Sequence, residues 1–188
     1  MIKKLTLIIG FIICLSSCGK DYVYRIEGEL SNLEDQTVYA VFEKDNYKVV
    51  DTVACTKPGQ FQIDQNEAGF HCVTIFFADK EHWVTAYLEP GETVKITGDA
   101  NSPLLLQVKG GRTNDKLAAF KKKIAPLLTE LTNLSNSLNS KDLNDTIEET
   151  DIAARLANVN MQLSEEAIRY VKENPNEEAS VVLIQSFF

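Results

Sequence analysis

Cysteine is scarce in this chain and is confined to its first 72 residues. The 188 residues include four cysteines, Cys14, Cys18, Cys55 and Cys72, and none follows Cys72. Thiol–disulfide exchange needs a reactive thiolate, commonly in a Cys-x-x-Cys pair. Cys55 and Cys72 are 17 residues apart and form no such motif. In an oxidising compartment they could form a structural disulfide, if their strands are neighbours, or remain two separate buried thiols.

Histidine is equally scarce, which leaves little material for a metal site. His71 and His82 are the two histidines, and His71 is adjacent to Cys72. Adjacent residues of a strand point to opposite faces, whereas zinc needs three or four ligands that converge. Serines lack a Gly-x-Ser-x-Gly context, and Gly110-Gly111 lacks the Lys-Ser/Thr of a phosphate-binding loop. We therefore predict no catalytic residue, no metal and no cofactor.

Positive charge is also in short supply. The formal net charge is −8, and the one dense basic run is Lys121-Lys122-Lys123. Nucleic-acid binding needs lysine and arginine gathered on one face. The composition argues against a nucleic-acid partner, and we interpret the three lysines as the solvated side of a helix.

The apolar run near the N-terminus is too short to cross a membrane. Residues 5–15 follow Lys3 and Lys4, whereas a membrane-spanning helix needs about 20 apolar residues. Leu15-Ser16-Ser17-Cys18 comes next, so the segment resembles a bacterial lipoprotein signal. We predict a signal peptide at 1–17, lipid on Cys18 and a tether at 18–21, which anchor the chain to a Gram-negative outer membrane. The membrane face stays open, as do the alternatives of an ordinary secretory signal and an N-terminal anchor.

Residues 22–109 have the pattern of a β-sandwich. Stretches rich in β-branched and aromatic residues alternate with turn signals, including Pro-Gly at 58–59 and 90–91. Six to eight short antiparallel strands would pack as two sheets. The expected strands cover 22–30, 37–43, 47–56, 60–64, 69–77, 84–88, 93–97 and 104–109.

Residues 112–188 have the pattern of helices. After Asn114, an expected N-cap, apolar residues recur every three or four positions up to Leu138, and Pro126 should kink this helix. A second helix is expected over about 146–173, which gives an antiparallel helical hairpin. A third begins near 177 and runs into Phe187-Phe188, which either pack back onto the helices or precede a segment missing from the chain.

Several sequence blocks, taken in order, carry a resemblance over residues 22–184. They are Tyr24-Arg25-Ile26-Glu27-Gly28, Val50-Asp51-Thr52, Gly59-Gln60-Phe61-Gln62-Ile63, Leu88-Glu89-Pro90-Gly91-Glu92-Thr93-Val94, Ile96-Thr97-Gly98-Asp99, Gly110-Gly111 with Asn114-Asp115, and Tyr170-Val171-Lys172-Glu173-Asn174-Pro175. Together they resemble the uncharacterised β-rich N-terminal domain of many Gram-negative envelope lipoproteins. In that family a thioredoxin-like domain usually follows, but no Cys-x-x-Cys exists here to carry its chemistry.

An aromatic cluster is the best candidate for a binding surface. Phe70, Phe76, Phe77, Trp83 and Tyr87 fall close together in the sequence, around an expected hairpin at 78–82. Aromatic side chains form sandwich cores and also bind sugars, peptides and proteins. The resemblance implies a non-catalytic accessory or binding module of a thiol–disulfide lipoprotein. The alternatives are a stand-alone surface lipoprotein that binds a glycan or protein through Phe76, Phe77, Trp83 and Tyr87, and a redox role for Cys55 and Cys72.

Overall fold

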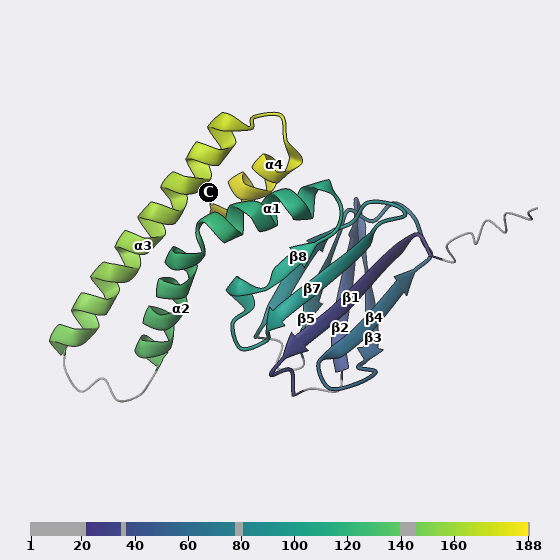
Figure 1. Ribbon diagram of the computed structural model, residues 1–188, viewed down its shortest axis with the longest axis horizontal. Helices are drawn as coiled ribbons and strands as arrows, with labels where there is room; N and C mark the ends of the chain where they lie inside the picture. Colours follow the sequence, from purple (N-terminus) through teal and green to yellow (C-terminus); the bar gives the residue numbers. More distant parts are fainter. Residues whose placement is uncertain (1–21, 35–36, 78–80, 140–145, 188) are drawn as a thin grey trace, which may run out of the picture.

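The structure is a computed structural model that describes residues 22–34, 37–77, 81–139 and 146–187. Within these ranges, two four-stranded sheets are followed by four α-helices (Figure 1). The expected β-sandwich with C-terminal helices is therefore confirmed, whereas the lipoprotein signal and tether lie outside the described residues. The strands are β1 (Tyr24–Ser31), β2 (Thr37–Lys44), β3 (Tyr47–Ala54), β4 (Gln60–Gln65), β5 (Cys72–Phe76), β6 (Trp83–Tyr87), β7 (Thr93–Asp99) and β8 (Gln107–Lys109).

The two sheets have the strand orders β4-β1-β7-β8 and β3-β2-β5-β6. All pairs are antiparallel except β1 with β7, which run parallel from Arg25↔Thr93 to Ser31↔Asp99. The expectation of a purely antiparallel sandwich is wrong at this pair. A strand that buries one face alternates in the same way whichever direction its neighbour runs, so the pattern carried no information on this point.

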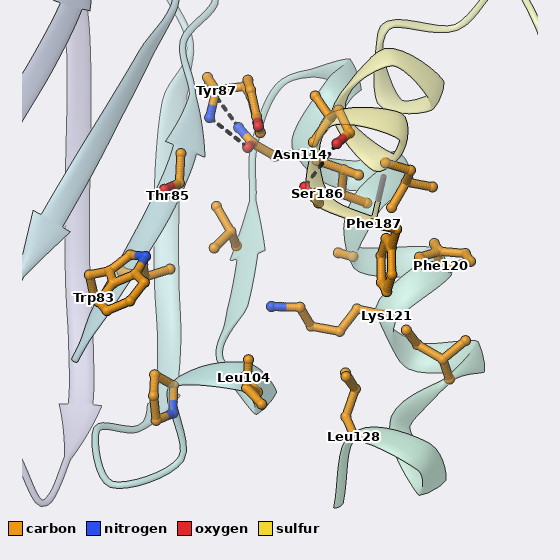
Figure 2. Close-up of a pocket in the computed structure, with 18 of the residues that line it drawn as sticks. Trp83, Thr85, Tyr87, Leu104, Asn114, Phe120, Lys121, Leu128, Ser186 and Phe187 are labelled. Carbon is orange, nitrogen blue, oxygen red and sulfur yellow. Dashed lines mark hydrogen bonds between the residues drawn. The ribbon is translucent and has the colours of Figure 1, made fainter. Parts of the chain in front are cut away.

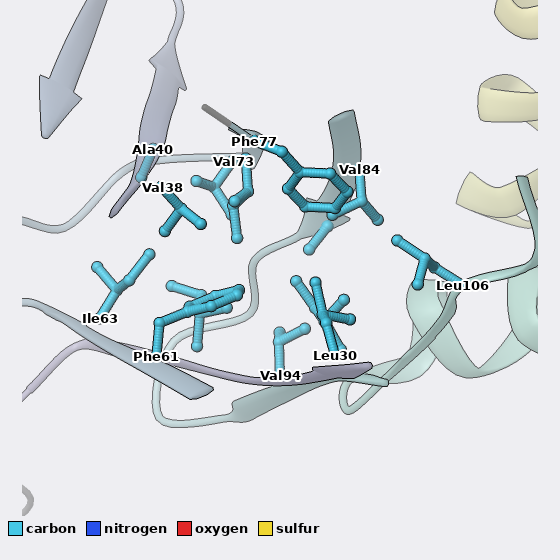
Figure 3. Close-up of a cluster of buried hydrophobic side chains, with 14 of the residues drawn as sticks. Leu30, Val38, Ala40, Phe61, Ile63, Val73, Phe77, Val84, Val94 and Leu106 are labelled. Carbon is cyan, nitrogen blue, oxygen red and sulfur yellow. The ribbon is translucent and has the colours of Figure 1, made fainter. Parts of the chain in front are cut away.

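The sandwich core is built from alternate residues of the strands. Phe61, Ile63 and Val94 from one sheet meet Val38 and Val73 from the other and Phe77, which follows β5 (Figure 3). Gly28 lies opposite Phe61 on the neighbouring strand, and a Cβ there would lie 2.2 Å from the phenyl ring. The missing side chain therefore provides the space that this ring fills.

The helices are α1 (Arg112–Lys123), α2 (Ala125–Asn139), α3 (Thr146–Glu173) and α4 (Glu178–Phe187). The expected first helix is broken in two at Ile124, two residues before Pro126, which lacks the N–H that a continuous helix would use. Helices α2 and α3 form the expected hairpin and extend away from the sandwich (Figure 1).

A second hydrophobic core joins the helices. Its buried members are Phe120, Ile124, Leu128, Leu134, Ile152, Val159, Leu163, Ala167 and Leu183, and Phe187 packs against them. Packing of Phe187 onto the helices agrees with one of the two expectations for the last residues. In the described part of the chain, no helix is long and apolar enough to span a membrane.

Candidate functional site: a cavity between β6 and the helices

Strand β6 is an edge strand of its sheet, and its unpaired edge faces the helices. The bond from Phe77 N–H to His82 O fixes the alternation of the β5–β6 ladder. Backbone groups of Val84 and Ala86 therefore face β5, and those of Trp83, Thr85 and Tyr87 face the open edge. Among the described residues, no group is hydrogen-bonded to the edge-facing N–H and C=O groups of Trp83 and Thr85.

Asn114 of α1 closes this edge at Tyr87. The Tyr87 N–H donates to Asn114 Oδ1 at 2.9 Å, and Asn114 Nδ2 donates to Tyr87 O at 2.7 Å and to Gly110 O at 2.6 Å. The amide thus takes the place of a neighbouring strand for one residue. The expected N-cap role of Asn114 is wrong, because Gly111 holds that position and Asn114 lies inside the first turn, 2% exposed.

Below Asn114, a cavity of about 430 Å³ separates β6 from the helices (Figure 2). The sandwich side of the cavity is lined by Glu81, Trp83, Val84, Thr85, Tyr87, Pro103, Leu104 and Val108, and the helices line the rest. The helical lining is Asn114, Leu117, Ala118, Phe120, Lys121, Ile124, Leu128, Val182, Leu183, Ser186 and Phe187. Trp83 and Leu104 are 53% and 45% exposed, so the cavity opens to solvent beside them.

Lys121 brings a positive charge into this mostly apolar space. Its side chain extends from α1 toward the strands (Figure 2), and Nζ donates to Leu106 O at 2.9 Å. Burial lowers the pKa of the Lys121 amine. Within the described residues, no carboxylate lies within ion-pair distance of it, although the exposed Glu81 also lines the cavity. The ammonium therefore retains unused hydrogen-bonding capacity.

The expected aromatic platform is divided between two environments. Phe77 is 2% exposed in the sandwich core, so its inclusion in a binding surface is wrong. Phe76 and Trp83 are cross-strand partners on the outer face, with ring centroids 6.1 Å apart. Tyr87 is half-buried against the helices, where burial raises its pKa to about 12. Phe70 is buried with Tyr24 and Phe42.

Neither Cys55 nor Cys72 forms a disulfide. Cys55 follows Ala54, which pairs with Thr37, whereas Cys72 pairs with Glu43 at the other end of β2. These six positions correspond to about 20 Å, beyond the Cα separation of about 7 Å that a disulfide tolerates. The disulfide alternative is therefore wrong, and two separate half-buried thiols are observed. Burial raises the pKa of the Cys72 thiol, the opposite of the shift that activates a redox cysteine.

The two histidines do not converge with Cys72. His71 Nε2 bonds to Asp45 Oδ1 at 2.8 Å on the surface. In the ranges that the structure describes, no group of three histidine, cysteine, aspartate or glutamate side chains could hold a metal ion.

Sequence reasoning missed Asn114 and Lys121 as parts of a site. The interpretation of the three lysines as solvated holds for Lys122 and Lys123, which are exposed, but is wrong for Lys121. Its spacing from Leu117 and Ile124, four and three residues, puts it on their face of α1 and could have identified it. On the sandwich wall, Trp83 and Tyr87 belong to the aromatic cluster that the sequence singled out, whereas Thr85 left no such signal.

Comparison with known proteins gives one match. Residues 24–117 match the model of a protein family described as a domain of unknown function, DUF4369. This region contains all eight strands and the beginning of α1. No curated protein and no solved structure matches the chain.

Proposed function

The chain belongs to the DUF4369 family, and we propose that this member is a lipid-anchored envelope lipoprotein that binds its ligand without chemical change. The observation that carries the binding role is the 430 Å³ cavity between β6 and the helices. Ligand sites are commonly cavities of about 300–1,000 Å³, mostly apolar with a few polar groups. Lys121 is such a group here, and Thr85 and Asn114 line the cavity beside it.

The lipid anchor is supported by the order of residues around Cys18. Lys3 and Lys4, the short apolar run and Leu15-Ser16-Ser17 precede it, as in lipoprotein signals. Acyl chains on Cys18 would hold the module at the outer membrane, on its periplasmic or its surface side. As an accessory module of a thiol–disulfide lipoprotein, it would keep a substrate or partner close to the membrane.

Metabolic labelling with an alkyne analogue of palmitate tests the anchor. We expect label on the wild-type chain and none on Cys18→Ala, because no other residue should accept the lipid. Cys14→Ala is the matched control, since Cys14 lies within the expected signal and should not affect labelling. Equal labelling of the Cys18 variant would contradict a lipid on Cys18.

Filling the cavity tests the binding role. Ala118 lines the cavity, whereas Ala119 is exposed on the same helix. Ala118→Leu should therefore block binding of an apolar fluorescent dye, and Ala119→Leu should leave it unchanged. Dye binding that is equal in both variants would show that the cavity is not the binding site.

The pair of half-buried Phe76 and exposed Trp83 favours a second candidate, a surface lipoprotein that binds a glycan or protein through its aromatic side chains. Protease treatment of whole cells would degrade the chain only if it faces outward. On this alternative, Trp83→Ala should abolish binding to immobilised host protein or polysaccharide. Loss of binding with Ala118→Leu instead would favour the cavity.

A further inference from the structure

We propose that the cavity beside β6 binds an amphiphilic anion, an apolar chain with a carboxylate at one end that pairs with Lys121. The inference rests on the binding role proposed above and names the class of ligand.

The walls favour an apolar chain. Leu117, Phe120 and Ile124 of α1 and the turn that follows it line the cavity together with Val182 and Leu183 of α4. Most other lining residues are apolar or aromatic as well. Removing hydrocarbon from water contributes about 25 cal/mol per Å² of buried area. Such walls would therefore bind a methylene chain, whereas a sugar would leave its hydroxyl groups without partners.

The charge favours an anion. Lys121 and Glu81 are the charged residues in the described lining, and Lys121 is the more buried of the two. Its Nζ bonds to a neutral carbonyl, that of Leu106, at the strand side of the cavity. A carboxylate next to Nζ would make a charge-assisted hydrogen bond with the half-buried ammonium. A neutral ligand would bring no counter-charge to the ammonium, whose hydrogen-bond partner is the neutral Leu106 carbonyl.

The opening fits the same ligand. Trp83 and Leu104 line the cavity and are also exposed, so an apolar chain can enter over apolar side chains. Lys121 reaches toward the strands, whereas Phe187 and Leu128 lie on the helical side (Figure 2). We therefore place the carboxylate at Lys121 and the chain among the side chains of α1 and α4.

An extended peptide is the competing class of ligand. It could pair with the edge-facing backbone groups of Trp83 and Thr85, as strands do when they extend a sheet. However, the turn η1 (Pro103–Leu105) lies close to β6 along this edge. The observations therefore favour the amphiphile, and a peptide becomes one outcome of the test.

Dodecanoate and dodecan-1-ol form a matched pair of probes, because they share a chain and differ in charge. Each would be titrated below its aggregation concentration into a form that begins at Gly19. This form retains every described element and both hydrophobic cores. Binding would be followed by calorimetry and by fluorescence of Trp83, the one tryptophan in the chain.

We expect dodecanoate to bind to the wild type. Lys121→Met should weaken the affinity for dodecanoate about tenfold or more, because a hydrogen bond to a charged group is lost. The same substitution should leave the binding of dodecan-1-ol unchanged. Lys122→Met is the control, since Lys122 is exposed on the same helix. If Lys121→Met unfolds the chain, Ala118→Leu against Ala119→Leu would still report whether dodecanoate enters the cavity.

The failures are distinguishable. If both probes bind equally and Lys121→Met changes neither, the cavity binds ligands but the inference about an anion is overturned. If neither probe binds, the cavity fails as a site for apolar chains, and the proposed binding role fails with it. Tighter binding of an apolar peptide with blocked termini would overturn the amphiphile in favour of strand addition.

Discussion

Removing the amide of Asn114 should destabilise the junction between the sandwich and the helices. Asn114→Ala deletes three hydrogen bonds and leaves the edge-facing N–H and C=O of Tyr87 without partners. Each buried group left unsatisfied costs about 1–3 kcal/mol, less where water can enter. The cavity below Asn114 admits some water, so we expect a loss of about 3 kcal/mol. For a chain of this length that corresponds to a fall in Tm of about 6–12 °C.

Urea unfolding would measure this loss with two signals. Fluorescence of Trp83 reports on β6, and far-ultraviolet circular dichroism reports mainly on the helices. Asn101→Ala is the matched control, because Asn101 is an exposed asparagine in a turn, and we expect it to cost less than about 0.5 kcal/mol. If Asn114→Ala costs no more than this control, the junction does not depend on the amide.

Asn114→Asp removes the Nδ2 donor but keeps the size of the side chain, so it separates the effect of the lost donor from that of the lost volume. The carboxylate can still accept from the Tyr87 N–H, but it places a negative oxygen against the carbonyl oxygens of Tyr87 and Gly110. We expect this variant to be at least as unstable as Asn114→Ala at pH 7. Its stability relative to Asn114→Ala should recover as the pH falls and the carboxyl group gains a proton. A pH-independent difference would refute the assigned contacts.

Three further predictions concern the sandwich and the cavity. Gly28→Ala should lower the free energy of unfolding by about 1–3 kcal/mol, because its Cβ would collide with the Phe61 ring; adding Phe61→Leu should recover part of this loss in urea titrations. Arg25, which bonds to Asp64 at 2.6 Å, holds the pKa of that carboxyl below its ordinary value of 3.8. Asp64→Asn should therefore cost less than about 1 kcal/mol at pH 7, since the pair is partly exposed, and the cost should disappear as the pH falls through the lowered pKa. For Lys121 the pH dependence has the same sign, because burial lowers its pKa below 10.5, so the unfolded chain holds the proton to higher pH. The stability of the wild type relative to Lys121→Met should rise from pH 7 toward pH 10, with Glu81 as the other charged group on the cavity, and a flat difference would contradict the burial of the amine.

The sequence by itself determined the elements. Alternation along the strands and turn signals such as Pro58-Gly59 identified all eight strands, because a half-buried strand must repeat every two residues. The three-and-four spacing of apolar residues identified the helices, and the bounds of α3 agree with the expected 146–173. Pro126 predicted the break after α1, because a proline has no N–H and disrupts the helical hydrogen bonds at its own position in the chain. The sequence also shows directly that it contains no Cys-x-x-Cys motif.

Only the tertiary structure decided which faces meet. The parallel pairing of β1 with β7, the separation of Cys55 from Cys72 and the burial of Phe77 depend on partners distant in the sequence. The cavity depends on them as well, since β6 supplies one wall and α1 and α4 supply the others. A local pattern records that a residue is buried, but it does not record against what. For that reason the sequence placed Lys121 in a solvated run, whereas in the fold it lines the cavity beside β6.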